Sequence, residues 1–399
     1  MPYYIGDVIR DDKRLIARTP EKFRETGIEV RLNTRVDEID ADEKVLRLSD
    51  GTLLSYDVLV LGTGTTPFVP PIPGVDLEGV FTLKKLTDAL RIKSHLKDGN
   101  CRKALIVGAG FIGMEMAEAL RVLGIETQIV HRGTTPVNRW DPELSGLILE
   151  ALKRNGVPFL TKTEIHSIEP GKDHLLRLNT NRGELEADMI LLALGVRPDV
   201  RLAGELGLKI GRTGAVQVNF SQQTSRGGIY AVGDCCEVFH RVSKRWVHIP
   251  LGDIANKQGR VAGRNIAGRP LSFPGVVGAQ SFGIFDLELA ATGINEKEAL
   301  ESGYHPVSSV TWGNALAGPM PDQKKVGLKL IADRSTGRLL GAQAVGEKGV
   351  VSRINALSVA LWSELGIDEI GYLDLAYAPP FGGSWDVIHN AAQALARKL

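Results

Sequence analysis

Hydrophobic and polar positions recur along this chain with two different periods, and the change of period locates its elements. Ala104 to Val107 is a short apolar run, typical of a strand buried on both faces. Apolar residues then recur at helical spacing from Met116 to Leu123, and Thr127 to Val130 is a second apolar run. The stretch from Lys103 to Arg132 therefore predicts strand, turn, helix and strand.

Two longer segments, Gly27 to Pro67 and Asn155 to Pro198, share one pattern. Each opens with a short strand, continues as an alternating meander, and closes with an acid (Asp57 or Asp188), a buried strand and a glycine turn. In the first copy we predict strands at Ile28–Leu32, Val36–Ile39, Val45–Leu48, Thr52–Leu54 and Tyr56–Leu61. The two segments look like copies of one unit, which must bury its faces in the same way each time.

The copies differ in what precedes them. The second follows the strand, turn, helix and strand of Lys103 to Arg132, whereas no such unit precedes the first. We call this strand, turn, helix and strand the head of a copy. The duplication therefore predicts a first head, of about 30 residues for a βαβ unit, upstream of Met1.

The remaining patterns predict further elements. Before residue 275 these are helices at Lys13–Thr26 and Lys84–Leu96, a strand at Ile229–Val232, a helix beginning at Cys235 and a helix at Ile254–Ile266. Beyond it they are strands at Val307–Thr311, Val326–Ala332 and Leu339–Val345 and helices at Val350–Glu364 and Ser384–Ala396, the pattern of an α+β domain.

Composition narrows the class of protein. At 399 residues the chain should hold two or three domains, and its net charge of +1 argues against nucleic acid and membrane surfaces as partners. No apolar run approaches the length of a membrane span, and the N-terminus has no apolar signal core, so we expect a cytoplasmic protein. Three cysteines, none with metal-ligand spacing, predict reduced thiols and no metal site.

Gly108, Gly110 and Gly113 follow the first strand with G-x-G-x-x-G spacing. The first glycine makes a tight turn, the second lets the backbone approach a pyrophosphate, and the third allows close packing of helix on strand. Such turns also occur in proteins that bind nothing, but a strand, an amphipathic helix and a second strand frame this one. We predict that it binds a dinucleotide.

The end of the second strand bears on the choice of cofactor. An acid there would bind the ribose 2′-hydroxyl of NAD, whereas arginine accommodates the 2′-phosphate of NADP. This chain has His131 and Arg132, with Arg139 nearby and no acid. The pattern favours NADPH over NADH, although a solvated arginine and dual specificity are both compatible with it.

Two further places carry candidate chemistry. Gly233 and Asp234 end a strand, where the carboxylate could accept hydrogen bonds from sugar-like hydroxyls; the alternative is an aspartate that caps the following helix. Near the C-terminus, Tyr377, Phe381 and Trp385 surround two prolines. This aromatic segment could pack on its own chain, but we favour a partner protein.

Four segments in this order resemble the pyridine nucleotide-disulfide oxidoreductase superfamily: LVLGTGTTP (Leu59 to Pro67), VGAGFIGMEMAEAL (Val107 to Leu120), LALGVRP (Leu192 to Pro198) and IYAVGDCCE (Ile229 to Glu237). The segments PYYIGDVI, PLGDIANKQGRVAGRNIAG and LAYAPPF are similar to its coenzyme A-disulfide reductase and NADH oxidase branch.

The resemblance implies an α/β fold with two Rossmann-like domains of three-layer ββα type, one for FAD and one for NAD(P), plus a C-terminal α+β dimerisation domain. The expected divisions are residues 1–100 (first FAD segment, lacking its N-terminal βαβ unit), 101–220 (NAD(P)), 221–274 (second FAD segment) and 275–399 (dimerisation). It also implies a homodimer.

Site residues follow from the same resemblance. FAD would be contacted by Val36, Thr63, Gly64, Gly233, Asp234, Leu251 and Ala255. NAD(P) would be held by Gly108, Gly110, Gly113, Arg132 and Gly195. Tyr377 resembles an interface tyrosine that reaches toward the partner's active site, and it is the one catalytic candidate.

The chain departs from the family at its start. Members begin with an FAD-phosphate G-x-G-x-x-G and carry a redox cysteine in a C-G-x-P-Y context, whereas here Met1 to Tyr4 resembles the tail of that context. We therefore expect a truncated or misassigned reading frame. We do not expect Cys101, Cys235 or Cys236 to replace the redox cysteine, since adjacent cysteines form only strained disulfides.

The function implied is an FAD-dependent oxidoreductase that passes hydride equivalents from NAD(P)H through FAD to a small acceptor. The acceptor would be a disulfide or polysulfide, such as coenzyme A disulfide, or O2. The alternative is a catalytically incomplete fragment or sensor that binds NAD(P)H but lacks the redox cysteine and the FAD-phosphate loop.

Overall fold

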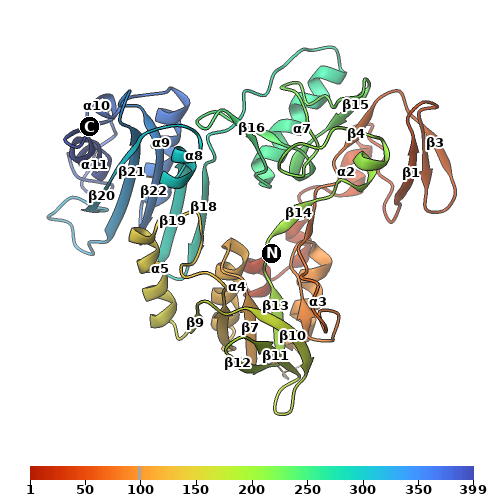
Figure 1. Cartoon of the computed structure of the whole chain (residues 1–399), viewed down its shortest axis with the longest axis horizontal. Coiled ribbons are helices and arrows are strands. Elements are labelled where there is room, and N and C mark those ends of the chain that lie inside the picture. Colours follow the sequence, from red (N-terminus) through yellow and green to blue (C-terminus); the bar gives the residue numbers. More distant parts are fainter. Residues whose placement is uncertain (98, 100) are drawn as a thin grey trace. The chain divides into compact units, whose positions relative to one another are not determined.

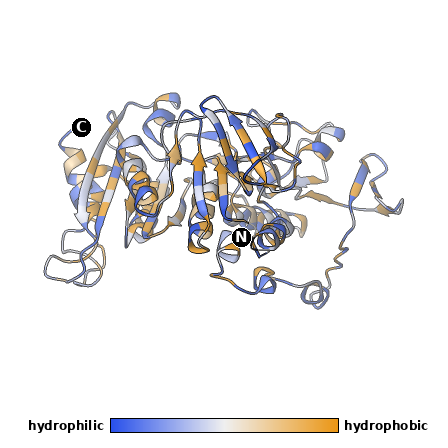
Figure 2. Ribbon diagram, turned by 90° about the horizontal axis from the view of Figure 1, so that it is seen from below, coloured by the Kyte–Doolittle hydropathy of each residue, from blue (hydrophilic) through white to orange (hydrophobic). Residues whose placement is uncertain are grey.

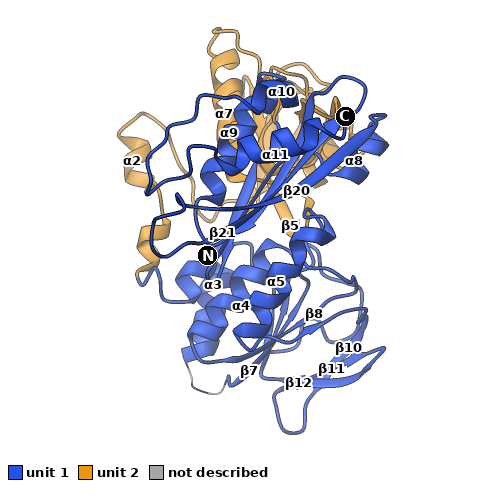
Figure 3. Cartoon of the chain, turned by 90° about the vertical axis from the view of Figure 1, so that its left-hand side faces the viewer, with its two compact units in different colours: residues 1–10, 67–195, 277–399 blue, residues 11–66, 196–276 orange. Residues whose placement is uncertain are grey.

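The computed structural model describes residues 1–97, 99 and 101–399, which form two compact units (Figure 3). The first unit comprises Met1–Arg10, Pro67–Gly195 and Val277–Leu399, and the second comprises Asp11–Thr66 and Val196–Val276. Each unit thus combines stretches that are far apart in the sequence. The finer division into four segments stays a prediction, and its boundary at residue 100 lies outside the described residues.

A parallel five-stranded sheet in the first unit carries the predicted glycine turn (Figure 1). Its strands lie in the order β6 (Val80–Phe81), β13 (Met189–Leu192), β7 (Lys103–Val107), β8 (Glu126–Val130) and β9 (Phe159–Leu160). The helices of this region are α3 (Leu86–Lys97), α4 (Phe111–Val122) and α5 (Pro142–Arg154). The predicted strand, helix and strand are confirmed as β7, α4 and β8, although the pattern missed α5.

The inner strands of this sheet are apolar on both faces because helices and a second sheet cover them. All four residues of β13 are buried, as are four of the five in β7. The second sheet is the antiparallel meander β10 (Ile165–Pro170), β11 (Leu176–Thr180) and β12 (Gly183–Ala187), which shares a core with β7 and β13.

The chain start belongs to the same unit. Helix α1 (Pro2–Ile5) packs on α4 and α3, and buried Lys93 of α3 fastens it. The Lys93 ammonium donates to Tyr4 O at 2.7 Å and to Asp7 Oδ1 at 2.6 Å. A buried ammonium group is stable only when its donors find partners, as they do here.

The C-terminal part of the first unit is an antiparallel sheet with helices packed on it. The strand order is β18 (Gln280–Ile284), β19 (Leu287–Gly293), β22 (Leu339–Gly346), β21 (Lys325–Asp333) and β20 (Pro306–Asn314). The helices are α8 (Glu296–Glu301), α9 (Val350–Trp362), α10 (Ile367–Ile370) and α11 (Val387–Ala396). The predicted α+β character is confirmed, and Figure 2 shows the apolar residues, in orange, on strands and helices near the C-terminus.

The second unit contains shorter elements. Its meander is β1 (Val36–Asp40), β2 (Val45–Leu48) and β3 (Leu53–Ser55), and β4 (Leu59–Leu61) pairs in parallel with β15 (Ile229–Ala231). The others are η1 (Asp12–Leu15), α2 (Pro20–Arg24), α6 (Arg201–Glu205), η2 (Gly233–Cys235), β16 (Val238–His240), β17 (Arg245–Val247) and α7 (Gly252–Ile266). Strands β5 (Thr65–Pro67) and β14 (Val196–Pro198) follow the two glycine turns and pair with each other.

Several predictions of single elements in this unit were wrong. The expected helix at Lys13–Thr26 is split into η1 and α2, because Pro20 lacks an N–H and begins a new helix. Residues 28–32 form no strand, and no α-helix begins at Cys235, where η2 ends and β16 follows after two residues. The buried strand predicted at Tyr56–Leu61 is shorter, and Val58 and Val60 are exposed.

Within the described part of the chain, no helix combines the length and the apolar character needed to cross a bilayer.

Candidate nucleotide-binding site

A cavity of about 640 Å³ opens over the glycine turn at the carboxyl ends of the parallel strands. Four of the five NAD(P) candidates line it, namely Gly108, Gly110, Arg132 and Gly195, whereas Gly113 is not among its lining residues. Its other lining residues are Phe68, Pro70, Val107, Ala109, Val130, His131, Asn138, Thr163, Glu164, Ile165, Ala193 and Leu194. This is the edge of an open α/β sheet where ligands bind.

The two inner glycines are required by close backbone contacts. Gly108 has φ +113°, and a Cβ there would lie 2.3 Å from Ala193 O. A Cβ on Gly113 would lie 2.3 Å from Gly108 O, so α4 could not pack so closely on the turn. These contacts fix the turn that presents the start of α4 to the cavity.

Gly110 is different because space is open around it. A Cβ there would meet no atom within 4 Å, and Gly110 caps α4 without any side-chain hydrogen bond. The N–H groups of the first helical turn are therefore left to a ligand, and the helix dipole favours an anion. The predicted pyrophosphate position is thus open, polar and positively polarised.

The two arginines after β8 have different surroundings. Arg132 lines the cavity and forms no hydrogen bond or ion pair with any described residue. Arg139 instead donates to both carboxylate oxygens of Glu298, at 3.2 and 2.9 Å, and to Gly293 O. Only Arg132 is placed to meet a ligand, while Arg139 fastens the loop beyond β8 to the C-terminal sheet.

The FAD candidates gather in the second unit, where β15 ends. Gly233 has φ +75°, its N–H donates to Gln258 Oε1 of α7 at 2.8 Å, and a Cβ on it would lie 3.2 Å from Ala255 Cβ. Asp234 follows, and its main-chain oxygen contacts His248 Nε2 at 2.8 Å. Leu251 begins α7 without a side-chain cap, so the helix N-terminus beside this loop keeps free N–H groups.

Thr63 and Gly64 form a turn that folds back on the loop after β14. Thr63 Oγ1 donates to Asp199 O at 2.6 Å, and Gly64 O accepts from the Asp199 N–H at 2.9 Å. Val36 lies on the meander, where its carbonyl accepts from Arg201 Nη2 at 3.2 Å. Tyr377 belongs to the first unit and is exposed.

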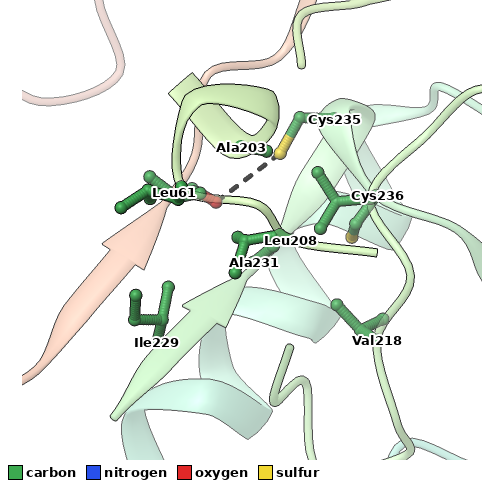
Figure 4. Packing of buried hydrophobic residues seen from close by; sticks show 10 residues of the cluster. Leu61, Ala203, Leu208, Val218, Ile229, Ala231, Cys235 and Cys236 are labelled. Carbon is green, nitrogen blue, oxygen red and sulfur yellow. Dashed lines mark hydrogen bonds between the residues drawn. The ribbon is translucent and has the colours of Figure 1, made fainter. Parts of the chain in front are cut away.

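The three cysteines are free and buried. Cys235 Sγ donates to Leu61 O at 3.5 Å in the apolar core around β4 and β15 (Figure 4), and Cys236 Sγ donates to Gly233 O at 3.3 Å. A hydrogen bond from the neighbouring Cys236 thiol, together with contacts to Thr63 and Gly64, lowers the pKa of Cys235 to about 6 despite its burial. Burial, and then the negative charge of Asp188, raises the pKa of Cys101 to about 12. Because all three are buried, none presents an accessible nucleophile.

Two family models cover most of the chain. The model of the pyridine nucleotide-disulphide oxidoreductases matches residues 5–259, and the model of their dimerisation domain matches residues 279–387. The chain belongs to this family. The α/β fold with a C-terminal α+β dimerisation domain, predicted from the sequence, is therefore confirmed.

Several proteins of this family resemble the chain over nearly all its length. The CoA-dependent NAD(P)H sulfur oxidoreductase of Pyrococcus abyssi is 38% identical over 98% of this chain and 88% of the relative. A NAD-dependent persulfide reductase from A. fulgidus superposes with a TM-score of 0.96 at 36% identity, over 100% of this chain and 75% of that one. An engineered water-forming NADPH oxidase bound to NADPH superposes with a TM-score of 0.95 at 26% identity. The match covers 100% of this chain and 89% of that one.

Oxidoreductases of this family use FAD and NAD(P)H, and the residues present fit the two cofactors unequally. The cavity over Gly108 has the open turn, the free helix N-terminus and the arginine that a dinucleotide needs. The loop at Gly233 and the uncapped start of α7 fit one side of FAD. The G-x-G-x-x-G spacing itself occurs once in the chain, at Gly108.

Sequence reasoning missed His131, Asn138 and Ile165 as lining residues. The duplication contained a signal for Ile165, because Ile165 and Val36 occupy the same place in the two meanders. Each stands before a register irregularity of its first strand, between Ile165 and Ser167 and between Val36 and Glu38.

Proposed function

We propose that this chain is an FAD-dependent oxidoreductase that takes hydride equivalents from NADPH in preference to NADH. The observation that carries the proposal is Arg132, a guanidinium without a protein partner on the wall of a dinucleotide cavity that has no acid at the end of β8. The engineered NADPH oxidase gives support, since its substitutions exchange one aspartate for alanine and two other residues for arginine.

When bound, FAD would take the hydride and hand electrons one or two at a time to the acceptor. In that scheme Gly110 and the start of α4 hold the pyrophosphate of NADPH, Gly108, Gly113 and Gly195 shape the loops around it, and Arg132 pairs with the 2′-phosphate. On the flavin side we assign Thr63, Gly64, Gly233, Asp234, Leu251, Ala255 and Val36 to FAD.

The acceptor we propose is a disulfide, polysulfide or persulfide of the coenzyme A type. Support comes from the sulfur oxidoreductase and the persulfide reductase that the chain resembles. O2 is the second candidate, favoured by the resemblance to the water-forming oxidase. Anaerobic NADPH oxidation with coenzyme A disulfide or polysulfide, compared with aerobic oxidation without them, separates the two.

We further propose a homodimer formed through the C-terminal sheet, with Tyr377 at the interface. Tyr377, Phe381 and Trp385 are 55%, 77% and 54% exposed, and all three lie inside the matched dimerisation domain. Aromatic residues are enriched where proteins associate. A Tyr377→Phe variant that still dimerises but turns over more slowly with the acceptor would support a role at the active site.

The substitution that tests the cofactor preference is Arg132→Met, which keeps the length of the side chain and removes its charge. We expect NADPH affinity to fall about 10- to 100-fold, the loss of a charge-assisted pair of about 1.5–3 kcal/mol, with NADH affinity nearly unchanged. Equal loss for both cofactors, or none, would contradict the assignment.

Arg139→Met is the matched control, because Arg139 holds the same loop without lining the cavity. It should weaken NADPH and NADH alike. The flavin assignment is tested separately by the absorption spectrum of the purified chain, before and after FAD and then anaerobic NADPH are added. Bound flavin that bleaches with NADPH supports an enzyme; no bound flavin supports the alternative of an NAD(P)H-binding chain without activity.

A further inference from the structure

His131 lines the dinucleotide cavity, and the proposed function gives it no role. It follows β8, at the place where an acid would bind the ribose of NAD, and it lines the cavity next to Arg132. Its main chain is fixed: the N–H donates to Leu160 O and the carbonyl accepts from Thr163 N–H, at 2.9 and 3.0 Å. The ring therefore starts from a rigid position at the cavity wall.

The ring itself has an unmet hydrogen-bonding group. Nε2 is buried and has no hydrogen-bond partner. A buried polar atom without a partner has lost its hydrogen bonds to water, so a ligand oxygen that reached Nε2 would restore one of them. Native proteins rarely leave such atoms without a reason.

Gly133, two residues along the chain, leaves the space that the imidazole of His131 occupies. A Cβ on Gly133 would lie 2.7 Å from Nε2, so the imidazole occupies space that any other residue at 133 would fill. The imidazole also packs against the ring of Phe159, with 5.7 Å between the two ring centroids.

The charges around the imidazole set its protonation. Arg132 adjoins it, Glu164 lines the same cavity, and Lys162 lies after β9, where its N–H donates to Gly133 O. Burial and then the positive charge of Arg132 lower the pKa of His131, while a main-chain contact with Thr135 opposes them. The ring is therefore neutral near pH 7 while the cavity holds no anion.

A phosphate in the cavity would reverse this balance. A phosphate monoester carries about −1.5 to −2 charges at pH 7, and its negative charge beside the imidazole favours the protonated ring. A ribose hydroxyl carries no charge and would leave the ring neutral. The two cofactors thus differ in what they do to His131.

We propose that His131 takes up a proton when a cofactor with a 2′-phosphate binds, and that this proton contributes to discrimination between NADPH and NADH. The inference rests on the proposed placement of the 2′-phosphate beside Arg132. The protonated imidazole and the guanidinium together neutralise the phosphate dianion. Affinity for NADPH then rises as pH falls, while affinity for NADH does not.

Calorimetric titration of the full chain with NADP⁺ and with NAD⁺ tests this, because neither turns over. Each is measured at pH 7.2 in two buffers of different ionisation enthalpy, PIPES and imidazole, and the difference gives the protons exchanged. We expect NADP⁺ to bind with uptake of about half to one proton and NAD⁺ with almost none. The phosphate itself would release protons on pairing with Arg132, so uptake has the opposite sign and identifies the imidazole.

His131→Gln keeps a hydrogen-bonding group but cannot titrate. It should abolish the uptake and flatten the pH dependence of NADP⁺ affinity, which in the original chain changes up to about tenfold per pH unit between the two pKa values of His131. His166→Gln, an exposed histidine of β10 that does not line the cavity, is the matched control and should leave both unchanged.

The outcomes separate the inference from the proposed function. Tighter binding of NADP⁺ that depends on Arg132 but brings no proton uptake, or the same uptake in His131→Gln, overturns the role of His131 alone. Equal affinity for NADP⁺ and NAD⁺, unaffected by Arg132→Met, overturns the cofactor preference on which it rests. Uptake with NADP⁺ that vanishes only in His131→Gln supports both.

Discussion

The two copies of the duplicated segment have the same local structure and very different surroundings. Asp57 to Pro67 aligns with Asp188 to Pro198 without a gap, and both glycine turns have positive φ, +72° at Gly64 and +95° at Gly195. The first strands of both meanders carry a register irregularity at the same place. Sequence alone therefore produced the same turns and meanders twice.

The two copies differ in what surrounds the strand before the glycine turn, which is β4 in the first copy and β13 in the second. β13 lies between β6 and β7, and Met189 and Leu191 are fully buried. β4 pairs with β15 alone among the described strands, and the aligned residues Val58 and Val60 are 39% and 42% exposed. Parallel strands are normally covered on both faces, so burial in these copies is decided by neighbours, not by the strand's own sequence.

The largest difference between the copies should come from the aligned pair Leu191 and Val60. Leu191→Ala removes a fully buried side chain and should cost about 2–5 kcal/mol, whereas Val60→Ala, on an exposed face, should cost less than about 0.5 kcal/mol. Amide hydrogen exchange of β13 and β4, read peptide by peptide, measures each local opening. Similar costs at the two positions would mean that β4 is covered in solution.

The second largest difference in stability cost should come from the aligned acids Asp57 and Asp188. Asp188 Oδ2 accepts from the N–H groups of Arg102 and Lys103 at 2.8 and 3.0 Å, and Oδ1 contacts His174 Nδ1 at 2.9 Å, whereas Asp57 is exposed. Asp188→Ala leaves two main-chain donors unpaired and should cost about 1–3 kcal/mol; Asp57→Ala should cost less than about 0.5 kcal/mol.

The same acid predicts a pH effect. Burial works against the charged form of Asp188, but the N–H of Arg102, His174 and the N–H of Lys103 hold the pKa of its carboxyl below the ordinary value. Its stabilisation is thus complete above the unfolded pKa of about 4 and is lost as pH falls through the lower folded pKa. Acid unfolding of Asp188→Asn should lack this component, and an unchanged acid profile would contradict the assignment.

The smallest predicted difference is between the two turn glycines. A Cβ on Gly64 or Gly195 would meet no atom within 4 Å, so only the positive φ resists substitution. Gly64→Ala and Gly195→Ala should each cost about 1–2 kcal/mol, the energy of a left-handed residue with a side chain, and should do so equally. Unequal costs, measured by exchange in β5 and β14, would mean that the turns are not equivalent.

The elements in which apolar residues recur with a clear strand or helix period could be predicted from the sequence. β7, the glycine turn, α4 and β8 carry a buried strand, three spaced glycines and an amphipathic helix in consecutive residues, so local sequence specified them. Elements near Pro20 and at residues 28–32 were not, because Pro20 begins a separate helix and residues 28–32 form no strand despite their apolar positions. The prediction of a first head before Met1 stays a prediction.

Some features of the candidate site could likewise be predicted from the sequence, and others could not. Gly108 and Arg132 were predictable from spacing, since their roles belong to the strand ends on which they lie. Arg139 looked equivalent to Arg132 in the sequence, and only the fold turned it toward Glu298. The sequence placed His131 at the end of the same strand, but that its Nε2 is buried without a partner depends on the surrounding side chains.

By itself, the sequence determined the glycine turn, the duplicated meanders and the family to which the chain belongs. These depend on backbone conformation and on periodicity, which neighbouring residues set. Only the tertiary structure decided which faces are buried, which arginine faces the cavity and which histidine is left without a partner. Those properties arise from contacts between residues far apart in the chain, as when Asp188 anchors the start of β7 at Arg102 and Lys103.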